Sequence, residues 1–165
     1  MSLAPPRRRL RLWPALQAAL LLTSLLAPLV ACAPRERGMR TCVRVVDGDT
    51  IVLDGGERVR LIGVDTPESV DPRRPVEWFG KEASAFTERL VEGRRVRLEY
   101  DQERRDRHRR TLAYVYLEDG TFVNLEIVRR GYGHAYTRHP FRYLERFRAA
   151  ERMARRERAG LWAGH

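Results

Sequence analysis

Cysteine is scarce in this sequence: Cys32 and Cys42 are the only two among 165 residues. Cys32 falls at the end of a leader segment, which leaves Cys42 without a partner, so we expect no internal disulfide. A structural zinc site is disfavoured as well, because Cys42 stands alone and the four histidines show no ligand spacing. The fold must therefore depend on its hydrophobic core.

The sequence also lacks an apolar run long enough to span a membrane comfortably. The uncharged run PALQAALLLTSLLAPLVAC (14–32) is short and contains Gln17 and Pro28. Four arginines precede it, which is the layout of a secretory signal. We therefore predict a signal peptide over residues 1–32 rather than a permanent transmembrane helix.

The end of this segment, Leu29-Val30-Ala31-Cys32, resembles the lipobox of bacterial lipoproteins. The resemblance implies that Cys32 is lipidated and becomes the new N-terminus, with its acyl chains holding the protein on a membrane surface of the bacterial cell envelope. The alternative is ordinary cleavage at the A-x-A pattern of residues 31–33, which would yield a secreted protein. Pro34 lies just past that cut, a position that such peptidases tolerate poorly.

Excess acidic charge is absent, since the formal net charge is +10. The leader carries four arginines and no acid, so its removal lowers the net charge to +6. A basic surface favours polyanionic partners such as nucleic acid or anionic lipid, although it serves equally as general solubility charge.

After a short polar tether (33–41), the pattern from residue 42 onward predicts one α+β domain (42–165) with five strands and about three helices. Asp-Gly turns separate the first three strands and favour a β-meander. The predicted strands cover 42–46, 50–53, 58–64, 94–100 and 111–117, and the predicted helices cover 78–93, 123–131 and 141–162. Strands in this number, with helices between and after them, are typical of a small domain built on a β-barrel.

Acidic side chains occur where the first strands turn. Asp49 is not needed to make its turn, and Asp65 ends the third strand, so adjacent strands would bring both carboxylates to one end of the sheet, with Glu68 nearby. Carboxylates held close together repel, and a divalent cation removes that repulsion. Oxygen ligands on turns suit Ca²⁺ better than a transition metal. Taken singly, each acid also fits an ordinary turn role, and Arg60 fits a surface position on an edge strand.

Five segments carry a resemblance to a known family: VDGDTIVL (46–53), VRLIGVDTPES (59–69), FGKEASAF (79–86), DRHRRTLAYVYL (106–117) and AGLW (159–162). In this order they resemble the thermonuclease, or staphylococcal-nuclease-like, family, and they cover residues 42 to 162. The resemblance implies an OB-fold with a five-stranded β-barrel and helices, in agreement with the independent reading of the strands.

The resemblance also implies roles for single residues. Asp49, Asp65 and the backbone carbonyl of Thr66 would bind Ca²⁺, and Glu68 would act as general base on a metal-associated water. Arg60 and Arg110 would contact the scissile phosphate. Substrate-binding roles fall on four residues: Arg73, Arg74, His108 and Tyr136.

Two departures from the family pattern lie in one loop. The family commonly has D-x-Y-G-R where this chain has Asp106-Arg107-His108-Arg109-Arg110, so Arg109 replaces a glycine and His108 replaces a tyrosine. The loop is therefore expected to follow a different path, and either Arg109 or Arg110 would reach the phosphate. Register against Leu112 favours Arg110.

The function that these features favour is a Ca²⁺-dependent endonuclease, a hydrolase that cuts DNA and/or RNA with low sequence specificity. The family resemblance further implies products that end in a 3′-phosphate. One alternative is an OB-fold module that binds nucleic acid without cutting it, although such relatives usually lack part of the acid and arginine set. A structural envelope lipoprotein would leave the acids unexplained. No protein partner is implied, and we expect a monomer with a solvated, arginine-rich final helix.

Overall fold

The structure is a computed structural model that describes residues 38–70 and 75–164. Cys32, Arg73 and Arg74, for which the sequence predicts lipidation and substrate contacts, lie outside the described residues. None of the helices in the described ranges is both long and apolar enough to cross a membrane.

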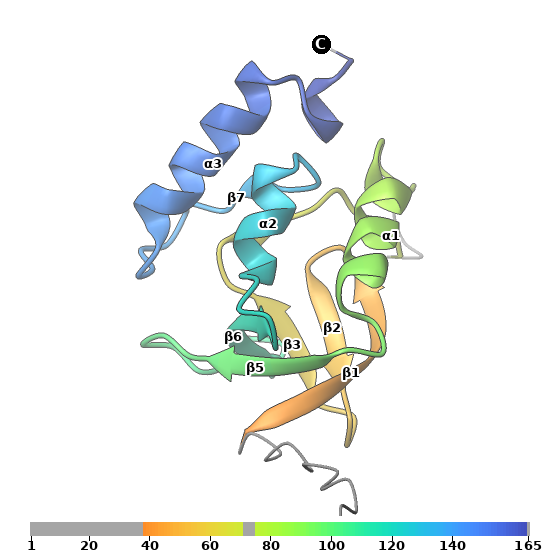
Figure 1. Ribbon diagram of the computed structural model, residues 1–165, viewed down its shortest axis with the longest axis vertical. Coiled ribbons are helices and arrows are strands. Elements are labelled where there is room, and N and C mark those ends of the chain that lie inside the picture. The colour runs from red at the N-terminus through yellow and green to blue at the C-terminus, as the bar shows by residue number, and fades with distance from the viewer. Residues whose placement is uncertain (1–37, 71–74, 165) are drawn as a thin grey trace, which may run out of the picture. The chain divides into compact units, whose positions relative to one another are not determined.

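Five strands close into a barrel in the order β1-β2-β3-β6-β5 (Figure 1). Their bounds are β1 Met39–Asp47, β2 Thr50–Leu53, β3 Arg58–Leu61, β5 Arg95–Glu99 and β6 Thr111–Leu117. The first three form the predicted antiparallel meander, and β3 pairs in parallel with β6 to close the barrel. β1 begins inside the stretch predicted as a tether, because Met39–Thr41 pair with β5.

A second, two-stranded sheet lies outside the barrel. β4 (Val64–Asp65) pairs antiparallel with β7 (His134–Ala135), which places Asp65 opposite His134. This pairing holds the chain leaving β3 against a segment about 70 residues further on, and it fixes the backbone at Asp65.

Three helices complete the fold: α1 Gly80–Val91, α2 Val123–Arg129 and α3 Leu144–Arg156, followed by a 3-10 turn at Gly160–Trp162. In Figure 1 α2 lies between α1 and α3, and it packs on both and on β6. The α+β class with a five-stranded barrel and three helices is thus confirmed.

Apolar side chains of the barrel form the core, and α2 is tied to them by one buried amide. Ile51, Val59 and Val115 are fully buried, as expected for β-branched residues facing the interior of a small barrel. Asn124 accepts from the backbone N–H of Val115 at 2.8 Å and donates to the carbonyls of Ile62 and Ala113 at 3.0 Å. Since a buried polar group is costly unless it is paired, this amide fixes α2 relative to the end of β3.

Helix α1 begins later than its apolar periodicity predicts. Phe79 lies before the helix in the left-handed region with φ 67°, and its ring stacks on Tyr132 with centroids 5.4 Å apart. Gly80 then starts the helix where a Cβ atom would lie 2.7 Å from the carbonyl oxygen of Glu68. The chain therefore enters α1 in close contact with the loop that carries Glu68.

Candidate functional site

Arg60 connects the two aspartates that the sequence places at strand ends. It lies in the middle of β3 opposite Thr50 of β2, so its side chain reaches the β1–β2 turn. Its guanidinium forms an ion pair with Asp49 and lies 3.4 Å from Asp65. One cationic group thus joins two carboxylates that are 16 residues apart in the chain, and both face the same end of the barrel.

The carboxylate of Asp49 is held by Thr50 of β2 and by Thr66, which follows β4. It accepts a hydrogen bond from the Thr50 hydroxyl at 3.0 Å and from both the N–H and the hydroxyl of Thr66 at 3.2 Å. The turn between β1 and β2 requires glycine at position 48, where a Cβ atom would lie 2.8 Å from the Thr66 side chain. The β1–β2 turn and the residue after Asp65 therefore meet directly at Asp49.

This donor set fits a hard divalent cation bound partly through water. The Arg60 guanidinium pairs with both Asp49 and Asp65, and the groups that could ligate a metal here are the oxygens of these two carboxylates and of Thr66. The Asp49 side chain is 9% exposed and that of Asp65 is 53% exposed, so one carboxylate is fixed and the other faces solvent. Within the described ranges no three Asp, Glu, His or Cys side chains gather closely enough to enclose a metal.

Arg110 supplies a second guanidinium beside Arg60. Its Nε donates to Asp106 at 2.7 Å, and its Nη1 donates to the Thr50 hydroxyl at 3.2 Å. Burial, together with the positive charge of Arg110, lowers the pKa of Arg60 to about 10, and the nearby aspartates counteract part of that fall. Because a guanidinium is a cation at neutral pH, two positive groups converge at one end of the cleft.

The loop before β6 decides which arginine reaches this point. Arg110 is half-buried and lines the cleft, whereas Arg109 is exposed. Arg109 has φ 62°, the left-handed conformation that glycine adopts without strain. The loop therefore keeps a glycine-like backbone at the position where the family pattern has glycine, and the arginine that follows it points inward.

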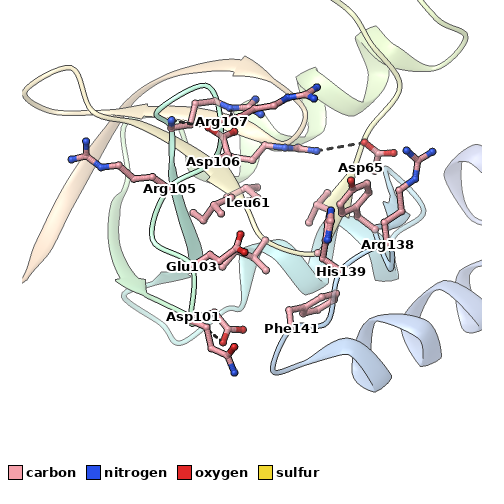
Figure 2. Close-up of a pocket in the computed structure, with 18 of the residues that line it drawn as sticks. Leu61, Asp65, Asp101, Glu103, Arg105, Asp106, Arg107, Arg138, His139 and Phe141 are labelled. Carbon is pink, nitrogen blue, oxygen red and sulfur yellow. Dashed lines mark hydrogen bonds and ion pairs between the residues drawn. The ribbon is translucent and has the colours of Figure 1, made fainter.

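The cleft itself is a hollow of about 660 Å³ between the loop 101–110 and the segment 136–141 (Figure 2). Arg60, Asp65 and Arg110 line one part of it, and so do two predicted substrate residues, His108 and Tyr136. The structure thus gathers five of the predicted site residues around one cavity. Asp49 does not line it but pairs with Arg60, and Thr66 donates to Asp49. Their catalytic and binding roles remain predictions.

Glu68 stands apart from these residues, because it does not line this cleft. Its Oε1 accepts a hydrogen bond from the N–H of Val70 at 2.9 Å. Its backbone is clamped to Glu77, whose N–H donates to the Glu68 carbonyl at 2.8 Å and whose carboxylate accepts from the Glu68 N–H at 3.1 Å. The loop is therefore well fixed, while the carboxylate is turned toward its own chain.

Asp47 is a buried acid whose part in the site the sequence does not reveal. Its Oδ1 accepts hydrogen bonds from the hydroxyls of Ser69 at 2.7 Å and Ser84 at 3.0 Å and from the N–H of Gly48 at 2.8 Å. Burial raises the pKa of Asp47, and the hydrogen bonds from Ser69, Gly48 and Ser84 counteract part of that rise. The acid thus ties the residue after Glu68 to α1. In the sequence, Asp47 is visible only as the first acid of the Asp-Gly-Asp turn, and a role in that turn is enough to explain it.

Asp106 is the other group that sequence reasoning misses. Besides the Nε of Arg110 it binds the backbone N–H groups of His108 and Arg110, both at 2.9 Å. Burial alone would raise the pKa of Asp106, but the hydrogen bonds and charge of Arg110 lower it overall. Asp106 therefore shapes the loop and orients Arg110 with one carboxylate.

Comparisons with known proteins place this chain beside nucleases. The family described as "Staphylococcal nuclease homologue" matches residues 58–164. A thermonuclease of Staphylococcus hyicus is 43% identical over 125 residues, which is 73% of this chain and 73% of that protein. A thermonuclease of Staphylococcus intermedius is 46% identical over 123 residues, 72% of this chain and 73% of the relative. The endonuclease YncB of Bacillus subtilis (strain 168) is 37% identical over 129 residues, 74% of this chain and 61% of the relative.

Proposed function

The chain belongs to the family of staphylococcal nuclease homologues, and from that membership we propose that this nuclease is a Ca²⁺-dependent endonuclease acting on DNA and RNA. The proposal includes low sequence specificity and products that end in a 3′-phosphate. One observation carries it: Arg60 and Arg110 converge in a cleft beside Asp49 and Asp65. Cations and carboxylates side by side are what a site needs to bind a phosphodiester and activate water.

The two arginines are suited to hold the scissile phosphate. A guanidinium is planar and can donate to two phosphate oxygens at once, and it keeps its charge at neutral pH. As water attacks phosphorus, negative charge grows on the phosphoryl oxygens, and donors fixed in advance stabilise that charge. Thr50 and Asp106 keep Arg110 fixed, and Asp49 does the same for Arg60.

Asp49, Asp65 and the carbonyl of Thr66 are the residues that would hold Ca²⁺. When bound, the ion would neutralise phosphate charge and lower the pKa of an attached water. Arg60 would then turn from Asp65 toward the phosphate, since it cannot bind both at full strength.

Glu68 is proposed as the general base. Its Oε1 would leave the N–H of Val70 and accept a proton from the attacking water, while the 5′ oxygen departs with the leaving strand. The clamp to Glu77 and the contacts of Ser69 keep the loop in place, so only the side chain has to turn.

The chain is further proposed to act at the cell envelope as a monomer anchored through a lipid on Cys32. The support is the sequence pattern of residues 1–32, and the alternative is a secreted protein. Mass spectrometry of the membrane fraction tests this directly: an acylated Cys32 is expected, and a soluble form that begins past residue 32 would contradict it.

Cleavage of single-stranded DNA by a chain that begins at Ala33 tests the central proposal. Digestion is expected with added Ca²⁺ and not with a chelator. Glu68→Gln should bind the strand as the parent does but lose most turnover, because removing one catalytic group typically costs about 10²-fold or more. Full activity in chelator would refute the calcium dependence, and tight binding without cleavage would favour a binding module.

A further inference from the structure

The cleft extends beyond the arginines, and its lining changes in character along its length. Arg105, Asp106 and Arg107 lie toward one end of the cleft, whereas Glu103 and Phe141 lie toward the opposite end (Figure 2). A second hollow, lined by Asp101, Gln102, Pro140, Phe141 and Arg142, shares four of these residues with the first. The groove therefore continues past the phosphate site between the loop 101–103 and the segment 140–142.

Of the two acids in this far part, only Glu103 is available to a ligand. Asp101 accepts hydrogen bonds from the Tyr114 hydroxyl, from the backbone N–H of Arg142 at 2.8 Å and from that of Gln102 at 2.9 Å. Glu103 is exposed, and among residues 38–70 and 75–164 no hydrogen bond or ion pair to its carboxylate is found. Asp101 thus shapes the wall, and Glu103 presents a free acceptor to the groove.

Phe141 gives this part of the groove a fixed aromatic wall. Its ring meets Phe147 edge-on, with centroids 5.2 Å apart, and it covers Gly63, where a Cβ atom would lie 2.8 Å from the ring. The absence of a side chain at Gly63 thus allows the ring to lie against the backbone there. An aromatic face held in this way can stack on a base, and such stacking accepts any base.

A carboxylate beside an aromatic wall suits the base of a nucleotide, whereas the arginines suit its phosphate. Glu103 repels phosphate and accepts hydrogen bonds from amino groups, as acidic side chains do with the N4 amino group of cytosine. Uracil and thymine offer a carbonyl at that position, which a carboxylate cannot bind.

We propose that the end of the cleft formed by Glu103 and Phe141 is a subsite for a nucleobase with an exocyclic amino group, next to the phosphate held by Arg60 and Arg110. This inference rests on the proposed function, because it takes the ligand to be a polynucleotide. It adds a base preference at a flanking position to an enzyme of otherwise low specificity.

Binding of oligo(dC) and oligo(dU) by fluorescence anisotropy, in chelator at pH 8, tests the subsite without cleavage. The two bases differ on one edge: cytosine has an amino group at C4 and an unprotonated N3, whereas uracil has a carbonyl at C4 and an N–H at N3. The parent chain should bind oligo(dC) more tightly than oligo(dU) by about tenfold or more, the size expected for one hydrogen bond to a charged group. Glu103→Ala should weaken oligo(dC) binding to the level of oligo(dU) and leave oligo(dU) unchanged or slightly tighter.

The sign of the change separates a base contact from simple charge repulsion. If Glu103 only repels the backbone, Glu103→Ala tightens both strands equally, and the subsite is refuted. Equal binding of the two strands by the parent chain refutes it too. Glu88→Ala, the same charge change on an exposed position of α1, is the control and should not alter the ratio.

Failure of the subsite and failure of the proposed function give different results. A chain that cleaves with Ca²⁺ but binds both strands alike is the proposed enzyme without the base subsite. A chain that discriminates between the strands but never cleaves with Ca²⁺ retains the subsite and refutes the calcium-dependent activity.

Discussion

Asp106 binds Arg110 at two points, accepting its Nε–H at 2.7 Å and its backbone N–H at 2.9 Å. The same carboxylate therefore fixes both the backbone of Arg110 and the direction of its guanidinium. Since catalytic donors work best when held in advance, this pair makes Asp106 a positioning residue for the proposed phosphate contact.

Replacing Asp106 tests that role. Asp106→Asn should lower kcat about tenfold with little change in KM, because a misaligned donor stabilises the transition state less. Arg110→Lys should lower kcat by about 10²-fold or more. In the Arg110→Lys background, Asp106→Asn should cost little further, since both changes affect one interaction. Fully additive losses in steady-state kinetics would contradict the positioning role.

Arg109 is predicted to be a strained position. A non-glycine residue at φ 62° costs about 1 kcal/mol relative to glycine, part of which is offset by the greater freedom of glycine in the unfolded chain. Arg109→Gly should therefore raise the free energy of unfolding by about 0.5 kcal/mol in urea titrations, whereas Arg107→Gly, an exposed neighbour without positive φ, should lower it or leave it unchanged. Equal effects at both positions would show that the strain is absent.

Arg60 should compete with the proposed metal ion. Its guanidinium pairs with both Asp49 and Asp65, so Ca²⁺ must displace it from at least one of them. Arg60→Gln is expected to tighten Ca²⁺ binding several-fold in calorimetry without substrate, while it reduces cleavage by about 10²-fold or more. Arg110→Gln is the matched control, because Arg110 pairs with Asp106 and should affect Ca²⁺ affinity less. Weaker Ca²⁺ binding in Arg60→Gln would contradict this competition.

The sequence predicts those parts of the fold that depend on neighbouring residues. The meander from β1 to β3 follows from β-branched runs and Asp-Gly turns, and the convergence of Asp49 and Asp65 follows from strands that are adjacent in the chain. The pairing of β4 with β7 has no such signal, because each strand has only two residues and the two strands are far apart in the chain. That pairing nevertheless fixes the backbone at Asp65.

The sequence predicts only part of the candidate site, namely the part that depends on residues close together in the chain. Arg60 and Arg110 are found from their motifs, but Asp106 lies in a loop crowded with charges, where nothing marks one acid above the next. Glu68 is adjacent in sequence to the site, yet its side chain bonds to Val70, because side-chain direction is set by contacts that spacing does not encode. The conformation of Arg109 could not be predicted either, because a positive φ is usually indicated by glycine and here an arginine adopts it.

Glu126 should make stability depend on pH in acid. Hydrogen bonds from Arg129, with those from Arg130, lower the pKa of Glu126 to about 2 from an ordinary 4.5. A carboxylate whose pKa is lowered on folding stabilises the protein above its unfolded pKa, and that contribution is lost as the pH falls from about 4.5 to 2. Glu126→Gln should therefore be less stable at pH 7 by about 0.5–1 kcal/mol, a modest figure because both arginines are exposed. Urea titrations at a series of pH values should show the difference vanishing near pH 2, and a constant difference would contradict the assignment.

Gly80 is predicted to affect activity as well as stability, because its missing side chain lets α1 approach the Glu68 loop. A Cβ atom there would lie 2.7 Å from the Glu68 carbonyl oxygen, which is backbone and cannot swing away. Gly80→Ala must therefore displace the loop by a few tenths of an ångström. Small misplacements of catalytic groups are costly, so kcat/KM should fall about tenfold at a temperature where the variant is fully folded.

The control for Gly80→Ala is Gly93→Ala. Gly93 has φ +74° with open space around it, so alanine there adds backbone strain of about 1 kcal/mol without touching the site. Both variants should unfold at lower urea concentration than the parent, but only Gly80→Ala should lose activity, and its loss should persist on a mononucleotide ester too small to reach the far end of the cleft. If Gly93→Ala loses as much activity as Gly80→Ala, the effect follows from stability alone, and the contact between α1 and the Glu68 loop has no part in catalysis.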